Sequence, residues 1–160
     1  MGRATLRRWM VGVAMLAVVA AAHAEDRHAG YYYPPPTSSE TYEARALTLA
    51  DSDRARRIGF VTLLTKQLLA QPYAPEFAVF VKGEQAEKLI IVGLQDGRLN
   101  TIYRARALFA NLTAVARDSE LFRDYGVEDV FTFFDLCKLL GFAQITISDG
   151  RDFAHQVLIK

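Results

Sequence analysis

Apolar residues recur at helical spacing over two long segments of the chain, which predicts two amphipathic helices. The first covers residues 51–71, where Asp and Ser at its start can cap a helix and prolines follow its end. The second covers residues 101–117. Two shorter helical segments are expected at residues 120–125 and 128–140, and Gly141 ends the last of them.

Four short apolar runs bounded by turn residues predict strands at residues 77–81, 89–94, 144–148 and 153–159. The second run is uninterrupted rather than alternating, so we expect that strand to be central. Short polar loops within each pair favour two hairpins. The predicted fold is therefore an α+β, two-layer domain. It has a mainly antiparallel four-stranded sheet packed with about three helices, in the order α-β-β-α-α-β-β.

The first residues have the pattern of an export signal. Three arginines precede an uncharged apolar run of 12 residues, and Ala22-His23-Ala24 fits a signal-peptidase site. Such a run is too short to span a bilayer, which takes about 20 residues. We predict a signal peptide over residues 1–24, cleavage between Ala24 and Glu25, and a periplasmic location. An uncleaved anchor is the alternative, and both Sec and twin-arginine export stay open.

Residues 25–50 are predicted to be an extended tether, and residues 51–160 a single α/β domain. The tether contains three tyrosines followed by three prolines: Tyr31, Tyr32, Tyr33, Pro34, Pro35 and Pro36. Consecutive prolines favour a polyproline conformation. We expect this segment to be a linker or a strap over the domain, and a docking motif is the alternative.

Charge and cysteine content limit the partners. Loss of the leader would leave 16 basic against 18 acidic residues, a net charge of −2. Such a surface has no electrostatic reason to bind nucleic acid or anionic lipid. No stable membrane insertion is expected after cleavage. Cys137 is the one cysteine, so no intramolecular disulfide can form.

Cys137 and His155 are the weak candidates for catalysis. On the helix predicted at residues 128–140, Cys137 lies opposite a polar stripe formed by Thr132, Asp135 and Lys138. A thiol there is desolvated and is a poor nucleophile. His155 alternates with Val157 on one face of the last strand, so a hydrolase dyad with Cys137 is conceivable. A buried, hydrogen-bonded structural histidine is the favoured interpretation.

Asp124, Glu128 and Asp129 are the weak candidates for metal binding. They cluster near the start of the helix predicted at residues 128–140, where carboxylates also complement the helix dipole. The chain has no Gly-rich phosphate loop, GxSxG elbow, HExxH or CxxC motif. No cofactor and no metal are expected, and the sequence favours a protein that is not an enzyme.

Several longer stretches carry a family resemblance: YYYPPPTSSETYEARA, RRIGFVT, PYAPEFAVFVKGEQAEKLIIVGLQDGRLNTIYRARALFANLTAVAR and GVEDVFTFFDLCKLLGF. They resemble a family of small exported alphaproteobacterial proteins that often carry the label "molybdopterin-guanine dinucleotide biosynthesis protein A". The resemblance implies molybdenum-cofactor biosynthesis or molybdoenzyme maturation. The LAGGxSxRMG-like loop of the nucleotidyltransferases to which the label refers has no counterpart here.

The leading hypothesis from the sequence is a small exported envelope protein that binds a partner without catalysis. Molybdenum-cofactor chemistry and a hydrolase that uses Cys137 and His155 are the alternatives. The expected contact surfaces are residues 31–36 and the exposed side of the first helix, with Arg56, Lys66 and Gln67.

Overall fold

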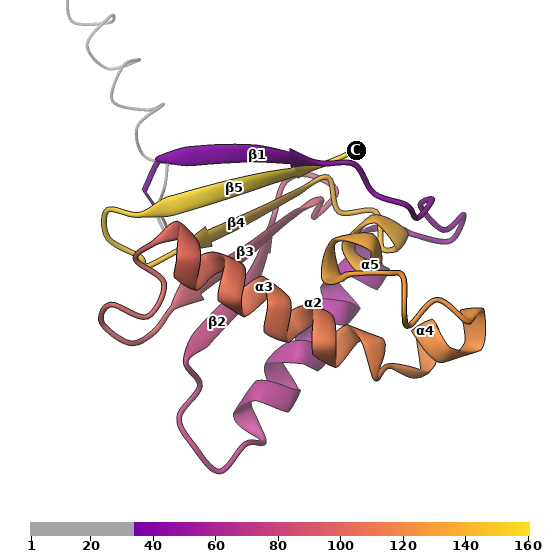
Figure 1. Ribbon diagram of the computed structural model, residues 1–160, viewed down its shortest axis with the longest axis horizontal. Helices are drawn as coiled ribbons and strands as arrows, with labels where there is room; N and C mark the ends of the chain where they lie inside the picture. Colours follow the sequence, from indigo (N-terminus) through magenta and orange to yellow (C-terminus); the bar gives the residue numbers. More distant parts are fainter. Residues whose placement is uncertain (1–33) are drawn as a thin grey trace, which may run out of the picture. The chain divides into compact units, whose positions relative to one another are not determined.

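A computed structural model describes residues 34–160 of the chain (Figure 1). The predicted signal peptide over residues 1–24, its cleavage site between Ala24 and Glu25, and the three tyrosines of residues 31–33 lie outside the described residues. Proline residues 34–36 fall within them, and Thr37 separates them from the first strand.

The described chain has five strands and four helices. The strands are β1 (Ser38–Tyr42), β2 (Phe77–Lys82), β3 (Lys88–Gly93), β4 (Gln144–Ser148) and β5 (Ala154–Ile159). The helices are α2 (Arg54–Leu69), α3 (Ile102–Arg117), α4 (Glu120–Tyr125) and α5 (Phe133–Leu139). The predictions for the four later strands and for α3 and α4 agree with these bounds to within one residue.

The predicted sheet, mainly antiparallel and four-stranded, is wrong. The five strands form one mixed sheet in the order β1-β5-β4-β3-β2. Pairs β2–β3 and β4–β5 are antiparallel hairpins, as expected, while β1–β5 and β3–β4 are parallel. The fold remains α+β, and β3 is an internal strand.

Two features of the chain explain the difference. Helices α3, α4 and α5 connect β3 to β4 and return the chain to the same end of the sheet, so the two hairpins join in parallel. Strand β1 lies inside the segment predicted as a tether, and it adds a fifth strand beside β5. Its sequence, SSETY, has no apolar alternation that would have revealed it.

The helices cover one face of the sheet (Figure 1). The core joins one face of the internal strands, including Leu89, Ile91, Ile145 and Ile147, to apolar residues of all four helices. Burial of this shared apolar surface is the main favourable term of the fold.

Helix α5 begins at Phe133, five residues later than the sequence predicts. Residues 127–131 instead form a turn, in which the amides of Val130 and Phe131 both donate to the carbonyl of Val127. Thr132 is the N-cap. The helix is seven residues long, too short to be stable by itself, so its ends need partners from elsewhere in the fold.

Asp135 supplies those partners at the N-terminal end. It is fully buried, not part of a solvated stripe. One carboxylate oxygen accepts hydrogen bonds from the amide and hydroxyl of Thr132 and from the Tyr42 hydroxyl, at 2.8–3.0 Å. The other accepts the amide of Arg45 at 2.7 Å. Burial raises the pKa of this carboxyl, but these hydrogen bonds lower it by more, so the net pKa lies below the usual value.

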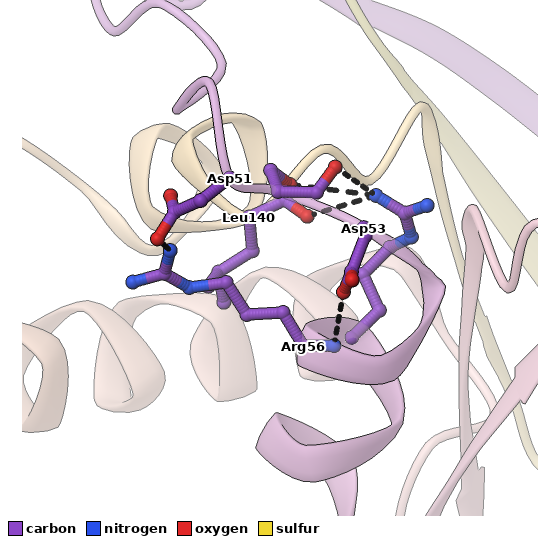
Figure 2. Close-up of polar contacts among 6 residues, drawn as sticks. Asp51, Asp53, Arg56 and Leu140 are labelled. Carbon is purple, nitrogen blue, oxygen red and sulfur yellow. Dashed lines mark hydrogen bonds and ion pairs between the residues drawn. The ribbon is translucent and has the colours of Figure 1, made fainter.

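Arg57 holds the C-terminal end. This residue is 6% exposed, and its guanidinium makes no ion pair with any described residue. Nη1 donates to the carbonyl of Leu140 at 3.2 Å, and Nε donates to the carbonyl of Gln85 at 2.8 Å. Figure 2 shows Leu140 beside the cap of α2, where Asp53 accepts the amide of Arg56. A cation at this position also complements the negative end of the helix dipole.

Gly141 makes room for this contact. Its φ is +77°, and its amide and that of Phe142 close a Schellman motif on the carbonyls of Lys138 and Cys137. A Cβ at Gly141 would lie 2.5 Å from Nη1 of Arg57. Gly126, which ends α4, also has a positive φ, +63°, yet a Cβ there would meet nothing within 4 Å.

These two glycines give a matched test of the Arg57 contact. We expect Gly126→Ala to lower the free energy of unfolding by about 1–2 kcal/mol, the cost of a left-handed backbone for alanine. Gly141→Ala carries the same cost and also displaces the guanidinium, so we expect a loss at least about 2 kcal/mol larger. Urea unfolding of both variants measures the difference. Equal losses would contradict the role given to Arg57.

Candidate functional site

A chain of polar side chains links β1, β5 and α3. Nδ1 of His155 lies 2.8 Å from the Ser38 hydroxyl, and Nε2 lies 3.2 Å from Oε1 of Glu40, without the alignment of a hydrogen bond. Oε2 of Glu40 accepts a hydrogen bond from Arg106 at 2.9 Å. Ser38 and Glu40 share one face of β1 because they are two residues apart.

Ser38, His155 and Glu40 are the residue types of a serine–histidine–carboxylate relay. Their surroundings, however, favour a structural role. The His155 side chain is 1% exposed, and Ser38 does not line any of the three cavities described below. Burial raises the pKa of the Glu40 carboxyl, and the contacts with His155 and Arg106 lower it by more, to below its usual value. Glu40 is therefore held as a carboxylate that fastens the edge strand to α3.

Cys137 and His155 do not hydrogen-bond to each other, as the alternative of a hydrolase dyad would require. Cys137 is fully buried in the core, and no hydrogen bond joins it to His155 within residues 34–160. Burial raises the pKa of its thiol well above the ordinary value. The partner of His155 is Ser38, a residue that the sequence analysis placed in the tether.

The acidic candidates are spread over α4 and the turn after it. Asp124 lies in α4, while Glu128 and Asp129 follow it. Within residues 34–160 there is no group of three His, Cys, Asp or Glu side chains that could hold a metal ion. Asp135, which the sequence analysis did not single out, is a fully buried carboxylate of this region, and four protein donors already occupy it. Oε2 of Glu128 is also buried, and it has no hydrogen-bond partner among the described residues.

The three residues of the contact surface predicted on the first helix, Arg56, Lys66 and Gln67, lie in different environments. Arg56 forms an ion pair with Asp51, visible in Figure 2. Lys66 and Gln67 are exposed near the end of α2. Gln67 lies at an apolar cavity, which makes it the member of this set with a specific place in the structure.

That cavity is the candidate functional site. It has a volume of about 490 Å³ and lies in the helical layer, with walls from α2, α3, α5 and the start of α4. Its apolar walls come from Phe60, Leu63, Leu64, Leu112, Val115, Ala116, Leu121, Phe133, Leu136 and Leu140. Leu63 and Val115 are 57% and 63% exposed, so the cavity opens to solvent beside them.

Two other cavities are more polar. One, of about 490 Å³, lies at the start of α3 and includes Arg98 and Arg104. Arg98 is paired with Glu76, and Arg104 donates to the side chain of Asn100. A third, of about 270 Å³, includes the Glu40–Arg106 pair. The charged groups named in both thus have protein partners.

Sequence reasoning missed the apolar cavity, although a signal for it exists. Phe60 and Leu63 are apolar positions on α2 outside the stripe of Ile58, Val61, Leu64 and Leu68 that predicts the helix. A helix with more apolar surface than one packed stripe needs a second contact. Which elements would line that second surface depends on the crossing of four helices, and the pattern of one helix does not specify it.

Comparison with family models, curated proteins and solved structures gives no match to this chain. Within residues 34–160, no helix has both the length and the hydropathy needed to cross a membrane.

The environment of Cys137 gives a direct chemical test. We expect iodoacetamide at pH 8 to leave the native protein unmodified and to alkylate it fully in 6 M guanidinium chloride, because the buried thiol stays protonated. Intact-mass measurement detects the adduct. Rapid alkylation under native conditions would show an accessible thiolate, and the hydrolase that uses Cys137 would then need to be reconsidered.

Proposed function

We propose that this chain is an exported protein of the cell envelope that binds a ligand or partner through the apolar cavity of its helical layer. The observation that carries the proposal is that cavity, which is open to solvent and lined by apolar side chains of four helices. Apolar clefts of about 300–1,000 Å³ with a few polar groups are typical of small-molecule sites.

The environments of the reactive groups support binding rather than catalysis. The thiol of Cys137 is sealed in the core, and His155 is buried between two side chains of β1. Asp135 and Arg57 are both used to hold α5. The apolar cavity, in contrast, is accessible for contact with another molecule.

Export is proposed from the leader, which has the charged start, apolar run and small-x-small end of a cleavable signal. A location outside the cytoplasm also disfavours a nucleotide-using transferase, since nucleotides are scarce there. An accessory role toward an envelope enzyme is compatible with this location.

One experiment tests location and binding together. The full chain is expressed in a Gram-negative host, and the protein is recovered from the periplasmic fraction and measured by native mass spectrometry. We expect a polypeptide that begins at Glu25, carrying a small non-covalent ligand that organic solvent removes. Ala24→Arg is the control, because a large cation at the cleavage site should leave the leader attached.

Full-length protein in the cytosol with Met1 retained would contradict the proposed location. Periplasmic protein that carries no ligand, and that gains no mass with any apolar probe, would contradict the proposed site.

A further inference from the structure

The mouth of the apolar cavity has a distinct polarity. Its polar members are Gln67 on α2 and Asp118 and Ser119 after α3. The hydroxyl of Ser119 is already used, since it donates to the carbonyl of Ala116 and accepts the amide of Phe122. The side chains of Gln67 and Asp118 have no hydrogen bond or ion pair with any other residue of 34–160.

The charge at the mouth comes from Asp118. Its carboxylate is exposed at the C-cap of α3. The next residue, Ser119, is the N-cap of α4, so the negative end of the α3 dipole and the positive end of the α4 dipole meet here and offset each other. The carboxylate therefore sets the sign of the charge, and it favours a cation over an anion at this position.

We propose that the cavity binds a single-chain amphiphile with a cationic head group, its tail among the apolar walls and its head beside Asp118. This inference rests on the proposed function and adds the chemical class of the ligand. The tail gains from leaving water, by about 0.8 kcal/mol for each buried CH₂. The head group stays partly exposed and adds little to the affinity, because surface ion pairs are weak. Its main effect is to distinguish cationic from anionic ligands.

A pair of probes with the same tail tests the assignment. Dodecyltrimethylammonium and dodecanoate are titrated below their micellar concentrations into the purified protein by isothermal calorimetry. We expect one molecule of the cationic probe to bind per chain, at least fivefold more tightly than dodecanoate. In Asp118→Asn the preference should fall below twofold, because the carboxylate that distinguishes the heads is gone.

Two alanines on α3 give a matched pair of variants for the tail. Ala116 is buried at the cavity wall, whereas Ala114 is exposed on the same helix. We expect Ala116→Leu to reduce binding of both probes at least tenfold by filling the cavity, and Ala114→Leu to bind like the parent protein. Val115→Lys, at an exposed position of the wall, is the second variant in case Ala116→Leu does not fold. It should abolish binding of the cationic probe, because its ammonium group takes the place of the head.

The outcomes separate the two levels of the proposal. Equal or tighter binding of dodecanoate would overturn the cationic head group and leave the apolar site standing. Binding of both probes that Ala116→Leu and Val115→Lys do not change would place them elsewhere and overturn the assignment. Failure of both probes to bind would overturn this inference and the proposed apolar site together.

Discussion

Helix α5 depends on two buried charges of opposite sign, one at each end. Asp135 connects the first turn of the helix to Tyr42, the last residue of β1, and to Arg45 in the chain that follows. Arg57 gathers its last carbonyl together with α2 and the β2–β3 loop. A helix of seven residues is marginal alone, and both charges match the helix dipole. The arrangement thus ties three separate segments of the chain to one short helix.

This constraint has consequences for the whole helical layer. Because α5 ends the crossover between the parallel strands β3 and β4, its position determines how α3 and α4 return over the sheet. It also supplies Phe133, Leu136 and Leu140 to the wall of the apolar cavity. The buried charges of Asp135 and Arg57 are used to hold this layer, and the apolar cavity is an accessible surface between its helices.

Local patterns predicted most of the elements, because helix periodicity, turn residues and caps act over a few positions. Helix α4 and strand β4 have the bounds that the sequence predicted. The predictions that failed concern features that depend on contacts between segments far apart in the sequence. Strand β1 is stabilised by β5, more than a hundred residues away, and His155 finds Ser38 through the same pairing. Asp135 has a helical spacing typical of solvent exposure, and only contacts from Tyr42 and Arg45 explain its burial.

Native-state hydrogen exchange of the α5 amides tests this dependence most directly. The amides of Leu136 and Leu140 donate within the helix, to Thr132 and Leu136. If both ends are held as described, these amides exchange only when the whole domain unfolds, with the same opening free energy as the amides of the central strand β4. Exchange of the α5 amides more than tenfold faster than those of β4 would show that the helix opens by itself, and would contradict the account.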